Sequence, residues 1–200
     1  MPIRSVMTQT IAFYEQNTDS FFDSTVSIDA QALYDHFLTL LPERGHILDV
    51  GCGSGRDSLE FMKKGYQVTA FDGSESLAKR ASELTGLSVE HSLFLDYTSG
   101  KMFDGIWACA SLLHAPLQEL TVTLSHLCQF LKDDGYFYCS FKYGEGEENR
   151  GGRHFTNLDE SGLEKVLEAT GLKISKLWVT QDLRPGRENE HWLNAILKKA

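Results

Sequence analysis

The sequence has no long hydrophobic run, few cysteines and a shortage of basic side chains. No window approaches the roughly 20 apolar residues that a membrane-spanning helix needs. Residues 1–16 also lack the apolar core of a secretory signal. The four cysteines, Cys52, Cys109, Cys128 and Cys139, show no C-x-x-C spacing. These absences predict a cytoplasmic protein with reduced thiols and no membrane partner.

The net charge and the composition of the chain limit the kinds of partner that it can bind. The 200 residues carry 28 acidic and 19 basic side chains, which gives a net charge of −9. That excess argues against nucleic acid or an anionic membrane as a broad-surface partner. The 42% hydrophobic content is ordinary for a globular protein, and the length fits one domain. No group of His, Cys and Asp has metal-ligand spacing, so no metal is expected.

Strand-like and helix-like segments alternate along the chain. Strands are expected at residues 46–50, 66–72, 87–91, 104–110, 136–143, 173–180 and 191–199. Helices are expected at residues 28–41, 55–64, 75–84, 116–131 and 159–171. The alternation through the first five strands predicts a parallel sheet with helices on both faces. The glycine- and charge-rich segment 144–155 is expected to be a mobile loop that closes over substrate.

The stretch "LDVGCGSGRDS", residues 48–58, places three glycines at every second position directly after the first strand. A glycine-rich turn between a strand and a helix presents backbone N–H groups and a helix N-terminus to a ligand. Side chains are excluded there because a Cβ would block close approach. Dinucleotide sites read G-x-G-x-x-G, whereas here the third glycine, Gly55, falls one residue early.

Three carboxylates accompany this turn. Asp49 precedes the glycines, and Asp72 ends the second strand about 20 residues later, where an acid can hold both hydroxyls of a ribose. Asp96 follows the third strand, where it can accept from the exocyclic amine of an adenine. The nearest cation, Arg56, lies inside the start of the helix. This acidic rim suits a ligand with positive charge and free hydroxyls better than a pyrophosphate.

The pieces "LDVGCGSG", "FDGS", "FLDY" and "WACASLLHAP" together resemble the class I S-adenosylmethionine-dependent methyltransferases, in particular a small, tellurite-resistance-like branch. The resemblance covers residues 46–143, and "FYEQNTDSFFDST" is a looser match near the N-terminus. It implies a Rossmann-like, mostly parallel sheet of seven strands in the order 3-2-1-4-5-7-6, with strand 7 antiparallel. It also divides the single domain into an N-terminal helical lid (1–44), a cofactor core (45–143) and a substrate-side part (144–200).

The resemblance further implies S-adenosylmethionine as cofactor and S-adenosylhomocysteine as its product. Asp49 then steers the cofactor ammonium, Asp72 holds the ribose, and Ala110 lies under the sulfonium. Leu95 and Asp96 flank the adenine. The positions that match the family's cofactor site are Tyr14, Asp49, Gly51, Cys52, Gly53, Asp72, Gly73, Ser74, Leu95, Asp96 and Ala110.

The substrate is expected at the ends of the fourth and fifth strands. His114 can accept a proton from the methyl acceptor near neutral pH, or it can simply hold the loop before Pro116. The other candidate substrate residues are Lys142, Tyr143, Arg150 and Arg153, with Arg184 and Arg187 in a later loop. The positive charge of the lysine and the arginines suits an anionic acceptor, although a solvated mobile loop explains it equally well.

The expected function is methyl transfer to a small molecule at O, N or S, or to a metalloid oxyanion. Such transfer depends on alignment and exclusion of water, so it does not require a catalytic side chain. The alternative is a protein that binds S-adenosylmethionine or S-adenosylhomocysteine without turnover. The glycine spacing disfavours an NAD-linked oxidoreductase, and the lack of a D/N-P-P-Y motif disfavours a nucleic-acid methyltransferase.

Overall fold

A computed structural model describes residues 3–200, and for residues 3–6 it describes the backbone alone. Its main sheet has seven strands in the order β3-β2-β1-β4-β5-β9-β8. These strands are β1 (His46–Val50), β2 (Gln67–Asp72), β3 (Glu90–His91), β4 (Phe103–Ala108), β5 (Leu131–Lys142), β8 (Leu172–Gln181) and β9 (His191–Lys199). The strand β9 is antiparallel to both of its neighbours. The predicted order and the predicted antiparallel seventh strand are therefore confirmed.

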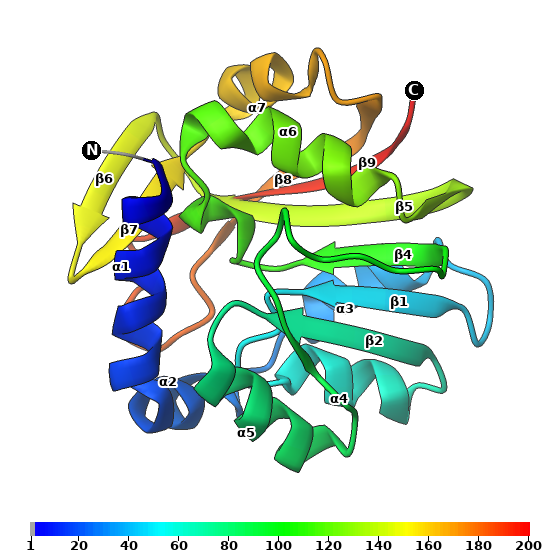
Figure 1. Ribbon diagram of the computed structural model, residues 1–200. Helices are drawn as coiled ribbons and strands as arrows, with labels where there is room; N and C mark the ends of the chain where they lie inside the picture. The colour runs from blue at the N-terminus through cyan, green and yellow to red at the C-terminus, as the bar shows by residue number, and fades with distance from the viewer. Residues whose placement is uncertain (1–2) are drawn as a thin grey trace.

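Helices cover both faces of this sheet (Figure 1). They are α1 (Ile3–Gln16), α2 (Thr18–Thr25), α3 (Gln31–Leu38), α4 (Arg56–Lys63), α5 (Glu75–Thr85), α6 (Leu117–Cys128) and α7 (Glu160–Leu167), with a short 3₁₀ helix, η1 (Leu112–His114). Among the helices that the structure describes, none combines the length and the apolar character that crossing a membrane requires.

Successive side chains of the central strands point to opposite faces of the sheet, so the hydrophobic core has two layers. Leu48 of β1 and Ile106 of β4 belong to the larger cluster, which includes apolar residues of α6 and α7. Their neighbours Ile47 and Trp107 belong to the second cluster, which includes apolar residues of α3 and α4. Successive side chains of a strand point to opposite faces, so a continuous apolar run is what a strand buried on both faces requires.

Four local predictions differ from the structure. The expected loop at 144–155 is largely a hairpin of β6 (Gly146–Arg150) and β7 (Arg153–Asn157). The third strand is only two residues long, and α3 is shorter than the expected helix at 28–41. Strand β5 begins at Leu131, so the segment 133–135, which was expected to separate a helix from a strand, lies within β5. A register shift between Phe103 and Gly105 of β4 accommodates that extra length.

The helix α1 brings the N-terminal segment to the carboxyl ends of the parallel strands. It lies beside the β6–β7 hairpin in Figure 1. Thr10 accepts from the backbone N–H of His154 on the hairpin at 3.0 Å. On its other side, Glu15 accepts from the hydroxyls of Ser74 and Ser76 at the start of α5. The helix therefore spans the strand ends where the sequence places the ligand.

Candidate active site

The glycine turn after β1 has a backbone that side chains would disrupt. Gly51 and Gly53 have φ angles of 67° and 56°, in the left-handed region that favours glycine. A Cβ at Gly51 would lie 2.7 Å from the Cβ of Ser111. The N–H groups of Gly51 and Cys52 both donate to the carbonyl of Phe71, at 3.0 and 3.1 Å, which fixes the turn to β2.

Asp72 at the end of β2 is held beside this turn. Its two carboxylate oxygens accept from the backbone N–H groups of Gly53 and Ser74, each at 2.8 Å. Burial raises the pKa of this carboxyl group, although these two hydrogen bonds favour its charged form. Each oxygen keeps a lone pair for a further donor. The carboxylate is therefore oriented to accept hydroxyl groups from a ligand that lies over the turn.

Two cavities meet at the turn, with volumes of about 370 and 80 Å³. The larger cavity continues toward the ends of β4, β5 and β9, and the smaller one lies toward β2 and the start of α5. Both are lined by Tyr14, Phe21, Gly51, Gly53, Ala110 and His114. Such a cavity, with convergent polar groups at the carboxyl edge of an open α/β sheet, is where ligands of this architecture bind.

Most of the predicted cofactor residues line one of these cavities. The nine that do so are Tyr14, Asp49, Gly51, Cys52, Gly53, Asp72, Gly73, Ser74 and Ala110. Leu95 and Asp96 line neither cavity, so their predicted place beside the adenine stays a prediction without support from the cavity lining. The N–H groups of Asp96 and Tyr97 bond to the carbonyl of Leu93, so the chain turns and leaves Leu95 and Asp96 exposed. Ser92 and Leu93 line the small cavity in their place.

Ala110, directly beyond β4, has an unusual backbone conformation. Its φ angle is 51°, which is rare for a residue other than glycine. The hydroxyl of Ser140 on β5 holds this conformation by accepting from the Ala110 N–H at 2.8 Å. Such strain costs free energy and persists only where the surrounding structure fixes it. The surroundings therefore hold the short side chain of Ala110 at the junction of the two cavities.

A buried polar cluster supports the floor of the large cavity. Asp57 accepts from the Tyr34 hydroxyl at 2.6 Å, the Trp107 indole at 2.8 Å and the Arg56 guanidinium at 2.6 Å. Burial alone would raise the pKa of Asp57, but the Arg56 charge and these three bonds outweigh it and lower the pKa. Asp57 was not among the residues predicted for the site. The only local sign of its role was an acid in the first turn of α4, which is a common position for a helix.

Asp49 is the second buried acid near the turn. It accepts from the Ser58 hydroxyl at 2.6 Å. Burial, followed by the charge of Asp57, raises the pKa of Asp49 to about 8. A cationic group placed beside Asp49 would lower that pKa again, because it favours the carboxylate over the neutral acid.

Both ring nitrogens of His114, in η1, form hydrogen bonds within the protein. Its Nδ1 lies 2.7 Å from the carbonyl of His154, so Nδ1 carries a proton and donates it. Its Nε2 therefore accepts from the Tyr14 hydroxyl at 2.8 Å. Burial lowers the pKa of His114 to about 4, and the charge of Arg153 acts in the same direction. The imidazole ring is therefore neutral, and its Nε2 lone pair is occupied by the hydrogen bond from Tyr14.

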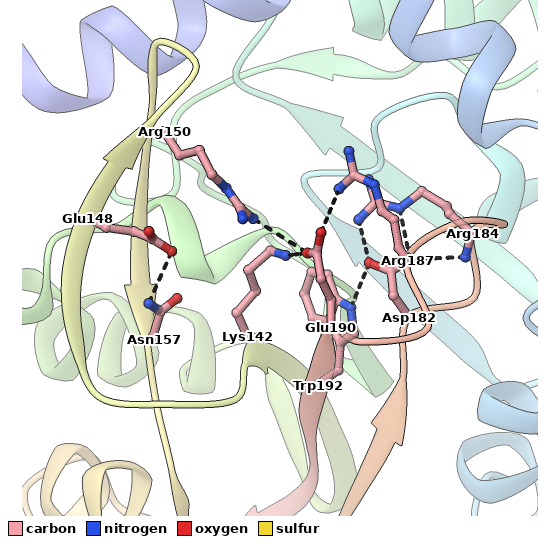
Figure 2. A network of polar contacts seen from close by, with 9 residues as sticks. All are labelled: Lys142, Glu148, Arg150, Asn157, Asp182, Arg184, Arg187, Glu190 and Trp192. Carbon is pink, nitrogen blue, oxygen red and sulfur yellow. Dashed lines mark hydrogen bonds and ion pairs between the residues drawn. The ribbon is translucent and has the colours of Figure 1, made fainter.

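Positive side chains gather at the far end of the large cavity. The five that line it there are Lys142, Arg150, Arg153, Arg184 and Arg187. Figure 2 shows that two carboxylates form ion pairs with four of these cations. Glu190 contacts Lys142, Arg150 and Arg187, whereas Asp182 pairs with Arg184 at 2.9 and 2.5 Å.

Tyr143 does not line the cavity with this group, so its predicted place among the substrate residues stays a prediction. The side chain is 45% exposed, and its hydroxyl donates to Glu160 at 3.0 Å. Side chains alternate along an extended chain, so Tyr143 faces away from the cavity when its neighbour Lys142 faces into it. Among residues 3–200, no set of three or more His, Cys, Asp or Glu side chains is placed to hold a metal ion.

Comparisons with known proteins identify the family of the chain. A family model described as a methyltransferase domain matches residues 22–177. An uncharacterized methyltransferase from Staphylococcus carnosus is 28% identical over 122 residues, which are 57% of this chain and 59% of that protein. The chain spans 47% to 59% of the length of the curated relatives it matches.

Solved methyltransferase structures share the fold. One is the 1,6-didemethyltoxoflavin-N1-methyltransferase of Burkholderia thailandensis, bound to 1,6-didemethyltoxoflavin and S-adenosylhomocysteine. It has a TM-score of 0.76 at 23% identity, over 97% of this chain and 87% of that one. The N-methyltransferase NodS of Bradyrhizobium japonicum, bound to S-adenosylhomocysteine, has a TM-score of 0.70 at 15% identity, over 92% and 97%. With a family model that matches more than half of its length, the chain belongs to the class I S-adenosylmethionine-dependent methyltransferases.

Proposed function

We propose that this protein binds S-adenosylmethionine at the glycine turn and transfers its methyl group to a small anionic molecule. The observation that carries the proposal is the Asp72 carboxylate, oriented by the N–H groups of Gly53 and Ser74 directly beside the turn. Asp72 would accept from the ribose hydroxyls, and Ser92 and Leu93 would flank the adenine in the small cavity.

The large cavity would receive the methionine end of the cofactor. Gly51 and Gly53 leave room for it, and Asp49 attracts its ammonium group. When bound, S-adenosylmethionine supplies a methyl group that is already activated by the sulfonium. Tyr14 and Phe21, which line the junction of the cavities, exclude water from the reacting atoms. The protein's main contribution is the alignment of acceptor, methyl and sulfur.

The acceptor occupies the far end of the large cavity, where five cations face two carboxylates. An excess of positive charge in a chain with a net charge of −9 supports an anionic acceptor. Because the Nε2 lone pair of His114 is bonded to Tyr14, the acceptor atom either reacts without a general base or displaces the Tyr14 hydroxyl. An acceptor atom that has a free lone pair and need not lose a proton before it attacks the methyl group satisfies the first condition.

Calorimetry with S-adenosylhomocysteine tests the cofactor site, with an expected Kd in the micromolar range, roughly −8 kcal/mol. Turnover is tested by following conversion of S-adenosylmethionine to S-adenosylhomocysteine in fractions of a metabolite extract. Tellurite belongs in the same panel because of the branch that the sequence resembles. Binding without turnover in any fraction would favour a protein that holds the cofactor without reacting it. The absence of binding would defeat the proposal.

A further inference from the structure

The tip of the β6–β7 hairpin places two arginines opposite each other. Gly151 and Gly152, with φ angles of 58° and 79°, form the two-residue connection between the strands. Two positive φ angles are typical of the tight turn that matches the twist of a hairpin. The turn makes Arg150 and Arg153 a directly paired cross-strand couple. Like charges in that position destabilise a hairpin, so the pair calls for an explanation.

Arg153 is held firmly but has no anionic partner among the side chains that the structure describes, those of residues 7–200. Its guanidinium lies 4.5 Å from the ring centroid of Phe13, 5.9 Å from that of Tyr14 and 5.3 Å from that of Phe155. These rings restrict its movement and attract its charge. Its Nε is buried without a hydrogen-bond partner. No ion pair of Arg153 is found within residues 3–200, although it lines the large cavity.

Arg150 is only partly neutralised. Its guanidinium lies 5.5 Å from the centroid of the same Phe155 ring and 3.4 Å from the Glu190 carboxylate. That carboxylate is shared with Lys142 and Arg187, as Figure 2 shows. The one negative charge of Glu190 is therefore shared by three cations, and no described carboxylate pairs with Arg153. A buried donor without a partner is costly, and an anion between the two arginines would remove both costs.

We propose that Arg150 and Arg153, here named the arginine pincer, bind an oxyanion group of the methyl acceptor. This inference rests on the proposed function and adds the part of the acceptor that is recognised: a carboxylate or a phosphate, the groups that guanidinium forks bind best. The pincer is close to the cofactor end of the cavity, because His154, next to Arg153, bonds through its carbonyl to His114. An oxyanion held there directs the remainder of the acceptor toward the junction of the cavities.

A different oxyanion, the methionine carboxylate of the cofactor, could occupy the pincer instead. The affinities of S-adenosylhomocysteine and of 5′-methylthioadenosine, which lacks the amino-acid part, distinguish the two cases. If the pincer serves the acceptor, Arg153→Gln changes the Kd of each ligand by less than threefold. A loss of tenfold or more for S-adenosylhomocysteine, with 5′-methylthioadenosine unaffected, would assign the pincer to the cofactor and overturn the proposal.

Direct anion binding provides the positive test. Inorganic phosphate and benzoate are titrated separately into the protein, with and without saturating S-adenosylhomocysteine, and binding is followed by calorimetry. We expect at least one anion to bind and to lose tenfold or more in affinity in Arg150→Gln and in Arg153→Gln. The two arms show whether phosphate or carboxylate is preferred. Arg44→Gln, in the exposed turn before β1, is the matched control and should leave both affinities unchanged.

These experiments distinguish a failure of the proposed function from a failure of the arginine pincer. If S-adenosylhomocysteine does not bind the wild-type protein, the proposed function fails, and the titrations without it still report on the pincer. If S-adenosylhomocysteine binds but neither anion does, or anion binding is insensitive to both arginines, the pincer is refuted and the cofactor site stands. Arg153→Lys keeps the charge without the planar fork, so affinity between that of the wild type and that of Arg153→Gln supports recognition by the fork.

Discussion

The replacement Asp72→Asn isolates the charge at the centre of the proposed cofactor site. The change keeps the shape of the side chain, but an amide has only one acceptor oxygen, whereas the carboxylate accepts from both Gly53 and Ser74 at 2.8 Å. One backbone N–H then faces an NH₂ group. A lost hydrogen bond to a charged group costs about 1.5–3 kcal/mol, and this applies to the free energy of unfolding of the unliganded protein.

The same charge is expected to hold the ribose hydroxyls, so ligand affinity falls as well. Loss of a charge-assisted bond of about 1.5–3 kcal/mol raises the Kd of S-adenosylhomocysteine by roughly 10- to 150-fold. Calorimetry measures the affinity, and urea unfolding measures the stability. Asp96→Asn is the matched control because Asp96 lines neither cavity. Unchanged affinity in Asp72→Asn would refute the assignment of the ribose, and equal losses in the two variants would place the adenine nearer to Asp96.

Two further predictions concern the glycine turn and the histidine. Gly51→Ala should lower the free energy of unfolding by about 2–4 kcal/mol through its positive φ and the collision with Ser111. Gly65→Ala, at a φ of 90° with no atom within 4 Å, should lose only the φ contribution, and equal losses would contradict the collision. The pKa of His114 is lowered from 6.5 to about 4, so the unfolded chain binds a proton first as pH falls through this range. The wild type should therefore lose up to about 3 kcal/mol of stability from pH 6.5 to pH 4. Urea unfolding of His114→Gln should show a weaker pH dependence than that of His91→Gln, and identical curves would reject this cause.

The parts of the fold that depend on local pattern were predictable from the sequence. The strand β1 has its predicted ends, and Ser74 begins α5 by accepting from the N–H of Leu77. A glycine turn, a cap and a continuous apolar run each act through neighbouring residues, so they can be read without the tertiary structure. The strand order followed from the resemblance of these pieces to a known family.

The hairpin β6–β7 was not predicted because its stability comes from distant contacts. All five residues of β6 are exposed, so the strand has no apolar alternation to mark it. In β7, by contrast, Phe155 and Thr156 are buried, and Thr156 donates to the carbonyl of Ala115 at 2.8 Å. Only the pair Gly151 and Gly152 gave a local sign, since adjacent glycines favour a two-residue hairpin turn.

The adenine side of the site depends on a turn that local pattern does not predict. Asp96 was placed beside the adenine because it follows the third strand. That strand ends at His91, as predicted, but the turn that follows leaves Asp96 exposed. The strand begins three residues later than predicted, because β2 pairs with β3 only at Phe71 and Asp72. The number of paired residues is a property of the sheet, and it cannot be read from the segment itself.

The role of His114 depends on a contact that spans the chain. The sequence places a histidine at the correct edge of the sheet, but a histidine acts as a base only when its neutral nitrogen is free. Here that nitrogen accepts from Tyr14, a residue 100 positions earlier. The docking of α1 therefore decides whether His114 supports the site or takes part in proton transfer. If an acceptor requires a base, its binding has to displace the Tyr14 hydroxyl, and Tyr14→Phe would then increase turnover instead of reducing it.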